Sequence, residues 1–344
     1  MRLRRARLWL AATVLVVVHL AALGADWIAP YDFATQHREF AYAPPTRLRF
    51  FDQEGQWHWR PFVQTQAGVV GDGGVSGARG AGDVAPLRLW VKGSPRQVGP
   101  WVVETRLFGV EEPARLFLLG TDGFGRDVFS RLLYGARISL LAGLLAAGLS
   151  VVLGFVLGTV AGFYGGRVDE ILMRFTELFL ALPWLYLLFA VRAVLPLELG
   201  PIRAFVVFIL IVGGIGWARP ARLFRGVAVA AKTQEFVLAA RGLGASDWHL
   251  VTRHVLPQSL GVFWTQFALL VPRFILAEVT LSFLGLGVGE PVPSWGNMLA
   301  NLRGLQVLVS YGWMLAPAAA LLVVVLCYEP LAAWLQQSPK SEIT

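Results

Sequence analysis

Side chains suited to catalysis or metal binding are sparse in this sequence. His249 and His254 lie near Asp247, a grouping that can belong to a metal site or to a catalytic triad. Without a nucleophile or further ligands beside them, we interpret both histidines as solvated surface residues. The zinc motif H-E-x-x-H, the nucleophile motif G-x-S-x-G and the phosphate-binding motif G-x-x-x-x-G-K-S/T are all missing. We therefore expect no catalysis, no metal site and no nucleotide site in this chain, so any energy source must lie on another polypeptide.

The most informative stretch is the segment 233–257, which reads TQEFVLAARGLGASDWHLVTRHVLP. Its capping and breaking residues predict two short helices in succession. The predicted boundaries are an N-cap at Thr233, a first helix over Lys232–Leu243, a stop at Gly244, an N-cap at Ser246 or Asp247, and a stop at Pro257.

The first predicted helix carries two small residues, Ala239 and Ala240, beside Arg241. Small side chains let the backbone of another protein approach closely, and an arginine offers a directional pair of donors to a carboxylate. Such a helix is suited to a groove in a partner protein. An ordinary amphipathic loop helix accounts for the same residues equally well, and the residue types alone leave both interpretations open.

The composition indicates a membrane protein. Of the 344 residues, 56% are hydrophobic and only 15% are charged, with a mean hydropathy of +0.59, whereas about 25% charged residues is typical of soluble domains. The runs are continuous and lack dyad alternation, which favours an all-α bundle. Six segments are long and apolar enough to span a membrane as helices: 8–29, 137–163, 171–195, 202–218, 260–287 and 308–335.

Basic residues predict the orientation of the spans. Arg2, Arg4, Arg5 and Arg7 precede the first apolar run, which we interpret as a retained span with a cytoplasmic N-terminus and not as a cleaved signal peptide. Six spans then place the C-terminus in the cytoplasm too. The net charge of +8 follows from this pattern, and no basic stripe interleaved with aromatic residues indicates nucleic-acid binding. The other basic residues of the predicted cytoplasmic segments are Arg167, Arg219, Arg222, Arg225, Lys232, Arg241, Arg253 and Lys340.

Between the first two spans lies a polar segment, 30–117, that is rich in glycine, proline and aromatic residues. We expect it to form a small extracytoplasmic β-rich insertion, with a glycine-rich loop over 68–83. The single cysteine, Cys327, lies in an apolar run and excludes a disulfide framework within the chain. The predicted strands cover residues 47–51, 56–60, 87–91 and 101–108.

Four blocks of sequence resemble the dipeptide/oligopeptide group of ATP-binding-cassette (ABC) importer permeases. They occur in the order typical of that group and cover the N-terminus and roughly residues 119–317. The blocks are WIAPYD (27–32) at the end of the first span, LGTDGFGRDVFSRLLYGARIS (119–139) as the pre-helix signature, LAARGLGASD (238–247) with RHVLP (253–257) as the "EAA" loop, and LSFLGLGV (281–288) with PSWGNM (293–298) as the late extracytoplasmic loop.

The resemblance implies a six-transmembrane-helix permease of the type I, MetI-like fold in the bacterial inner membrane. It implies a second homologous permease, two ATPase subunits that bind ATP and Mg, an extracytoplasmic solute-binding protein and membrane lipid as partners, with no cofactor on this chain. Di- or oligopeptides are the implied solutes. The "EAA" loop would be the coupling helix, seated in a cleft of an ATPase and moved by it as a rigid body. The residues assigned to this coupling are Glu235, Ala239, Ala240, Arg241, Gly244, Asp247 and Pro257.

Two features depart from that group. The glutamate that names the motif is replaced by Leu238, with Glu235 one turn earlier, and the sequence after Tyr328 lacks the usual Gly-Asp-x-Leu-Arg-Asp ending. The predicted parts of the chain are the N-terminus with the first span (1–29), the insertion (30–117), an amphipathic pre-helix segment (118–136), the permease core (137–335) with its coupling loop (219–259), and a cytoplasmic tail (336–344).

Small residues recur every four positions along the second predicted span. Such a stripe allows close helix packing, either within the subunit or against the partner permease. A stand-alone secondary transporter or channel would instead show inverted repeats and paired intramembrane acids, and a membrane-bound enzyme would need a nucleophile or metal cluster in 30–117. We find neither pattern in the sequence. The residues of the stripe are Ser150, Gly154, Gly158, Gly162 and Gly166.

Overall fold

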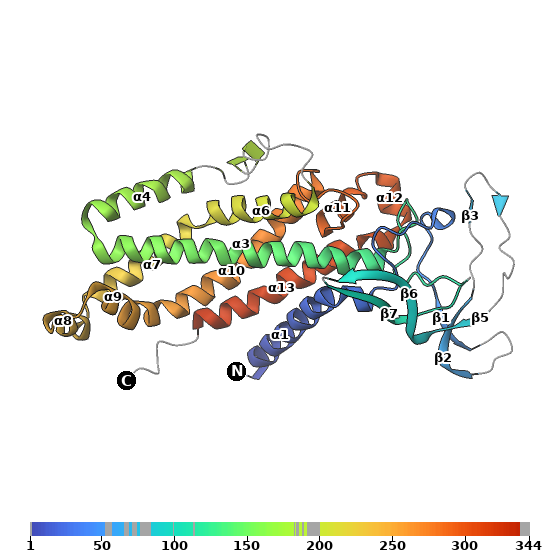
Figure 1. Cartoon of the computed structure of the whole chain (residues 1–344), viewed down its shortest axis with the longest axis horizontal. Coiled ribbons are helices and arrows are strands. Elements are labelled where there is room, and N and C mark those ends of the chain that lie inside the picture. Colours follow the sequence, from blue (N-terminus) through green and yellow to red (C-terminus); the bar gives the residue numbers. More distant parts are fainter. Residues whose placement is uncertain are drawn as a thin grey trace. The chain divides into compact units, whose positions relative to one another are not determined.

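The computed structural model forms two compact units (Figure 1). Unit 1 comprises Met1–Leu15, Leu140–Glu278 and Val323–Thr344, and unit 2 comprises Val16–Ser139 and Val279–Leu322. Unit 1 is helical in its described part, whereas the described strands all belong to unit 2. The structure describes residues 2–51, 57–64, 69–70, 74–75, 84–98, 100–112, 114–181, 183, 186–187, 189–190 and 200–337.

Among the described residues, four helices are long and apolar enough to cross a membrane. A fifth apolar passage consists of α6 (Pro201–Gly216) and α7 (Ala218–Lys232), which meet at a bend of 44°. The prediction of a mostly helical membrane protein is therefore confirmed. The four long helices are α1 (Arg2–Leu23), α3 (Val128–Tyr164), α10 (Leu256–Phe283), which continues a helical run from Asp247, and α13 (Ala316–Gln337).

The predicted span over 171–195 is described only at its start. Helix α4 (Gly166–Ala181) covers that start and carries an exposed ion pair between Arg174 and Glu177, 3.8 Å apart. Residues 182, 184–185, 188 and 191–195 of this span lie outside the described residues.

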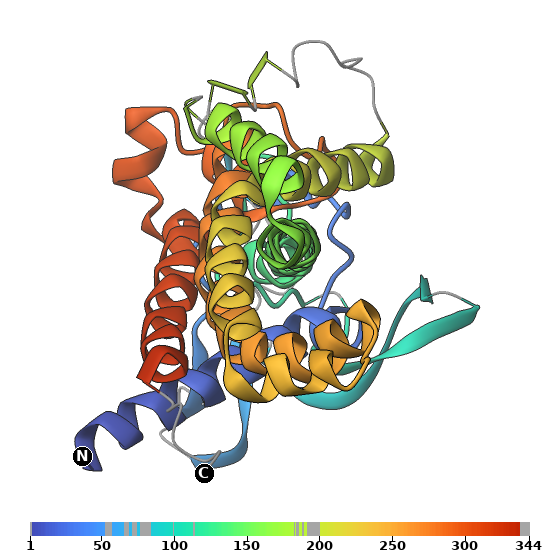
Figure 2. The same cartoon turned by 90° about the vertical axis from the view of Figure 1, so that its left-hand side faces the viewer.

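Helix α3 packs tightly against α7 within unit 1, and α4 also contacts α7. A Cβ atom added to Gly154, Gly158 or Gly162 of α3 would lie only 2.2–2.6 Å from atoms of α7. Since these atoms belong to the same chain, the glycine stripe serves packing within the subunit at these three positions. Figure 2 shows α3 end-on, with α4 and α7 beside it.

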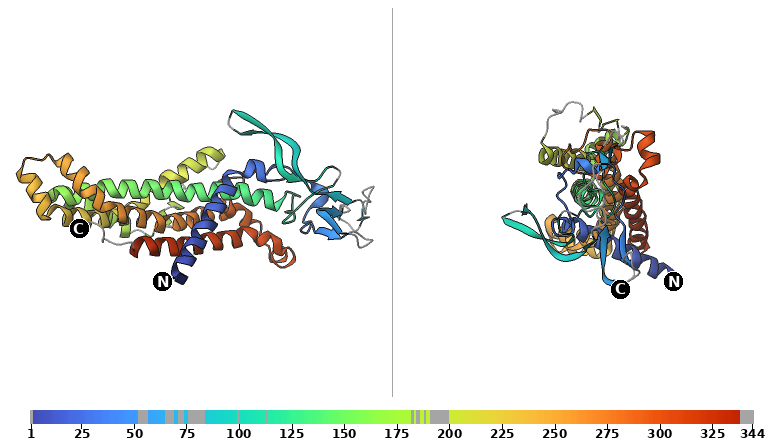
Figure 3. Two further views of the ribbon diagram at one scale, coloured as in Figure 1. Left: turned by 90° about the horizontal axis from the view of Figure 1, so that it is seen from below. Right: turned by 90° about the vertical axis from the view of Figure 1, so that its right-hand side faces the viewer.

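The described residues of the insertion in unit 2 form three separate sheets. One sheet joins β1 (Leu48–Phe51), β2 (Trp57–Gln64) and β5 (Val84–Pro86), and a second joins the two-residue strands β3 (Val69–Val70) and β4 (Gly74–Val75). The third is a hairpin of β6 (Arg88–Val98) and β7 (Trp101–Gly109), drawn apart from the other strands in Figure 3. All four predicted strands are thus confirmed, while most of the predicted loop over 68–83 lies outside the described residues.

Buried polar contacts join distant segments in unit 2. Trp295 is fully buried at the start of α11 (Trp295–Ala300), and its indole donates a hydrogen bond to the Leu132 carbonyl at 3.1 Å. The backbone N–H of Trp295 donates to Ser139 Oγ at 3.1 Å. Two of the sequence blocks, 119–139 and 293–298, therefore meet in one core. The remaining short helices of this unit are α2 (Ala25–Ile28), η1 (Arg38–Phe40), α12 (Leu305–Ser310) and η3 (Gly312–Leu315).

Candidate functional site

The segment 233–257 folds as two short helices after α7, but their boundaries differ from the prediction. Helix α8 covers Glu235–Gly242 and has Gln234, not Thr233, as its N-cap. Thr233 instead closes α7, and its hydroxyl donates to the Ala230 carbonyl at 2.9 Å. The N-cap prediction for Thr233 was wrong because the preceding helix runs up to this residue, so its side chain serves a C-terminus.

Gly244 ends the first helix as predicted. Its φ of +87° lies in the left-handed region, and its N–H donates to the Arg241 carbonyl at 3.0 Å. Ser246 is the N-cap of the second helix, α9 (Asp247–Leu250), and its hydroxyl accepts from the His249 N–H at 3.3 Å. The sequence left Ser246 and Asp247 as alternatives for this cap, and the structure uses Ser246.

Pro257 does not stop the second helix. A π-helical turn, Val251–Val255 (η2), follows α9 and leads directly into α10, so Pro257 lies in the first turn of a long helix. The π turn accommodates the proline without ending the helix, since the Leu256 N–H bonds to the Val251 carbonyl directly before the position where Pro257 provides no N–H. The prediction of a helix end at Pro257 was therefore wrong.

An apolar core within unit 1 fixes the two short helices. Val237 of α8 and Leu250 of α9 are buried with Val255 against Phe163, at the end of α3. Ala228 and Ala231 of α7 complete this cluster, and Ala240 packs at its edge. Buried side chains on both short helices therefore share one core with α3 and α7.

Polar contacts reinforce this connection. Lys232 Nζ donates to the Gly162 carbonyl at the end of α3 at 2.9 Å. The Arg241 guanidinium lies 3.4 Å from Asp247 and 5.5 Å from the ring centroid of Phe163. A single residue, Arg241, therefore connects both short helices to α3.

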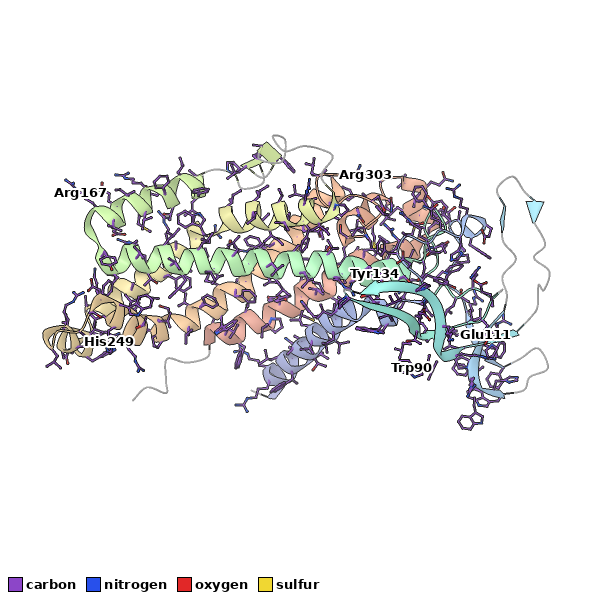
Figure 4. All side chains as sticks on the ribbon, viewed as in Figure 1. Trp90, Glu111, Tyr134, Arg167, His249 and Arg303 are labelled. Atoms are coloured by element: carbon purple, nitrogen blue, oxygen red, sulfur yellow. The ribbon has the colours of Figure 1, made fainter. Side chains whose placement is uncertain are left out.

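The outward side of this pair of helices exposes large apolar residues. Leu243 is 90% exposed and Trp248 is 77% exposed, while Phe236 and Leu238 are each about half exposed. We refer to these four side chains as the apolar loop surface. Large apolar side chains exposed on a support fixed by a buried core are typical of a protein interaction site. Figure 4 labels His249 of α9 at this end of unit 1.

The residues that the sequence assigned to coupling surround this surface. Pro257 is exposed at the start of α10, and Ala240 is the one member that is half-buried. Sequence reasoning missed Leu243 and Trp248, although large apolar residues in a loop predicted to face water were the available signal. The exposed members on the two helices and the turn between them are Glu235, Ala239, Arg241, Gly244 and Asp247.

No metal site accompanies this surface in the described part of the chain. Within that part, no three His, Cys, Asp or Glu side chains are grouped closely enough to hold a metal ion. His249 is exposed, and its ring centroid lies 6.0 Å from that of His254 in an edge-to-face arrangement. The two imidazole rings therefore pack edge to face against each other.

Unit 2 contains a partly buried ionic cluster that the sequence did not predict. The guanidinium groups of Arg126 and Arg131 are both buried, and they contact Glu290 at 2.7 and 3.0 Å. Asp122 also pairs with Arg126 at 2.7 Å. The cluster joins the 119–139 block to the loop after α10 and balances two positive with two negative groups.

Asp127 lies beside this cluster, directly before α3. Its Oδ2 atom accepts hydrogen bonds from the Ser130 N–H and hydroxyl at 2.8 and 2.6 Å. Burial raises the pKa of the Asp127 carboxyl to about 7, although the bonds from Ser130 oppose this shift.

Comparison with known proteins connects this geometry to a family. The family model described as "Binding-protein-dependent transport system inner membrane component" matches residues 154–341, which include the entire α7–α9 region. The oligopeptide transport system permease protein OppC of Bacillus subtilis is 37% identical over 212 residues, or 61% of this chain and 67% of that protein. The glutathione transport system permease protein GsiD of Pectobacterium atrosepticum is 36% identical over 228 residues, covering 66% of this chain and 73% of that protein.

The match to a further relative covers a smaller share of that relative's length. The dipeptide transport system permease protein DppC of Bacillus subtilis is 40% identical over 194 residues, which are 56% of this chain and 58% of that protein. A putative peptide permease of Brucella suis is 33% identical over 258 residues, covering 74% of this chain and 82% of that protein. With the apolar spans, these matches identify an integral membrane permease that works with other ABC transporter components and is not itself an enzyme. The chain belongs to the family of binding-protein-dependent transport system inner membrane components.

Proposed function

We propose that this permease forms half of the translocation pathway of an ATP-driven peptide importer and that its apolar loop surface docks into an ATPase subunit. A second homologous permease would complete the pathway, and two ATPases and an extracytoplasmic solute-binding protein would complete the importer. The solute class is proposed from the relatives, whose names specify oligopeptide, dipeptide and glutathione transport.

One observation carries the docking proposal. Leu243 and Trp248 hold large apolar side chains in water, although the helices that bear them are fixed by a buried core. Exposing such side chains is unfavourable, by roughly 1.5–3 kcal/mol for each compared with full burial. A docked partner removes this cost, and aromatic anchors of this kind often dominate the energy of an interface.

The geometry also supports transmission of movement. The docked surface shares a core with α3 and α7, so displacement of α8 requires displacement of at least one of these helices. Packed cores move between discrete arrangements and do not deform continuously, which suits them for transmitting closure of an ATPase. Gly244 fits this proposal because no heavy atom lies within 4 Å of the position that its Cβ would occupy, leaving room for a partner backbone.

The proposed orientation places both termini and the α8–α9 loop in the cytoplasm of a bacterial cell, and the 30–117 insertion outside. It is supported by Arg2, Arg4, Arg5 and Arg7 at the N-terminal end of α1, in agreement with the excess of basic residues on cytoplasmic segments. This orientation puts the apolar loop surface on the side where ATP is available.

The substitution Gly244→Asp tests the proposal in the assembled importer. We expect it to leave the permease in the membrane but to separate ATP hydrolysis from solute import, because a charge would occupy the open space at the contact. Gly244→Asn has the same size and tolerates positive φ to a similar degree, so it controls for backbone strain. Gly304→Asp, at the N-cap of α12 in unit 2, controls for the added charge. Normal uptake by Gly244→Asp would refute the docking proposal.

A further inference from the structure

We infer that the β6–β7 hairpin lies in the membrane–water interface at the C-terminal end of α1, where Leu89, Trp90 and Val102 contact lipid. This role is separate from the proposed coupling to an ATPase. It concerns the insertion in unit 2, and it does not depend on which side of the membrane the insertion occupies.

Two arginine side chains fix the hairpin to the residues that directly follow α1. Arg96 of β6 is buried, and its Nη1 atom donates hydrogen bonds to the carbonyls of Asp26 and Ala29 at 3.2 and 3.4 Å. Arg106 of β7 donates to the Pro30 carbonyl. Because these acceptors follow a span without any intervening loop, the hairpin lies at the depth of the α1 end.

That depth corresponds to the membrane surface. After the four arginines, the apolar helical run extends from Leu8 through α1 and α2 to Ile28, a length of about 31 Å, and the hydrocarbon core of a bilayer is about 30 Å thick. The end of this run, where the hairpin is bound, therefore reaches the interface. The second half of α1 and α2, which lead to this end, also carry exposed apolar residues: Val16, Val17, Leu20, Leu23 and Trp27.

The hairpin itself turns large apolar side chains outward. Leu89 is 70% exposed and Trp90 is 68% exposed, and Val102 on the neighbouring strand is also exposed. In a regular strand, neighbouring side chains point to opposite faces. The φ of +57° at Trp90, which Figure 4 labels on this hairpin, breaks this alternation, and both Leu89 and Trp90 are exposed. A bulky residue in the left-handed region is strained and persists only where its surroundings compensate.

Lipid is the occupant that matches the residue types around this patch. Tryptophan is enriched at membrane interfaces, where its ring lies among apolar chains and its N–H reaches water. Lys92 is exposed on the same hairpin and can extend its ammonium group to lipid phosphates, as can Arg88, which also pairs with Glu111 at 2.5 Å. Glu104 is the exposed acid of β7 and shares a strand face with Val102, so Val102 marks the aqueous edge of the proposed lipid contact.

Site-specific labelling tests this inference on the full chain. Cys327 is first replaced with alanine, and a single cysteine at Trp90 or Val102 is labelled with an environment-sensitive NBD fluorophore. The protein is reconstituted into phosphatidylcholine vesicles with or without lipids that carry a nitroxide at acyl carbon 5. The matched control is a cysteine at Trp59, a residue that is 90% exposed on β2 of another sheet. Two labelled strands keep the test valid if one variant fails to fold.

We expect NBD at positions 90 and 102 to emit at shorter wavelength than at position 59 and to be quenched at least threefold more by the lipid nitroxide. Quenching of position 90 by aqueous iodide but not by the lipid nitroxide would overturn the inference. A short-wavelength emission without nitroxide quenching would also overturn it, since this result indicates burial against protein, such as a second copy of the chain.

Discussion

A methyl group at Gly158 would separate α3 from α7 in unit 1. An ideal Cβ at this position lies 2.2 Å from the Ala221 carbonyl oxygen and 2.9 Å from the Ala221 Cα. Carbon–oxygen contacts between packed backbones are usually about 3.3–3.6 Å, so Gly158→Ala requires a local separation of roughly 1 Å. The obstructing atoms are backbone atoms of a helix, and a rotamer change cannot relieve the clash.

The expected cost follows from this geometry. Overpacking of a close-packed core costs typically about 1–3 kcal/mol, while replacing glycine with alanine inside a helix gains up to about 1 kcal/mol. Gly148→Ala is the matched control on the same helix, because its nearest neighbour, Phe267, lies at an ordinary 3.9 Å. We expect the control to gain stability slightly and Gly158→Ala to fall below it by about 1–3 kcal/mol.

Thermal unfolding of the purified permease in detergent measures this difference. For a chain of this size, 1–3 kcal/mol corresponds to a lowering of Tm by about 1–4 °C relative to Gly148→Ala. Because α7 leads directly into α8, the variant should also show weaker coupling between ATP hydrolysis and uptake in the assembled importer. A Gly158→Ala protein as stable as Gly148→Ala would refute the assignment of the stripe to the α3–α7 contact.

Further predictions concern the apolar loop surface and the buried acid of unit 2. Trp248→Ser should change the free energy of unfolding by less than about 0.5 kcal/mol, since Trp248 lies on the surface. It should weaken ATPase association at least 30-fold in a pull-down titration, the equivalent of about 2 kcal/mol at an interface anchor. Trp59→Ser is the control. Asp127 in the folded chain binds its proton more tightly than in the unfolded chain, because burial raises its pKa to about 7. Its contribution to stability is therefore fully present near pH 4 and is lost as the pH rises through 7. Wild-type Tm should accordingly be higher at pH 5.5 than at pH 8, and Asp127→Asn should reduce this difference; an unchanged pH dependence would show that Asp127 is not its source.

Local patterns in the sequence predicted most of the architecture. The apolar runs located the helices, and alternation with turn residues located the four strands, because both depend on neighbouring residues. Gly244 was predictable as a helix end since only a residue without a Cβ adopts positive φ at low cost. Thr233 and Pro257 were misread because the helices beside them extend further than their capping and breaking residues suggest.

Contacts between distant segments had no comparable signal. Glu290 meets Arg126 across 164 positions of sequence, and nothing in either local pattern specifies that pairing. The outward direction of Leu243 and Trp248 depends in the same way on the core that forms between α3, α7 and the two short helices. The sequence therefore located the candidate site, whereas the structure was needed to identify its apolar side chains.

Photo-cross-linking from position 243 tests the docking of the apolar loop surface most directly. Benzoylphenylalanine replaces Leu243 in the complete importer, and Trp59 carries it in a parallel control. We expect illumination to join position 243 to an ATPase subunit, identified by mass spectrometry through the peptide that contains its phosphate-binding motif, with no such product from position 59. An assembled importer that hydrolyses ATP but yields no ATPase product from position 243 would contradict the account.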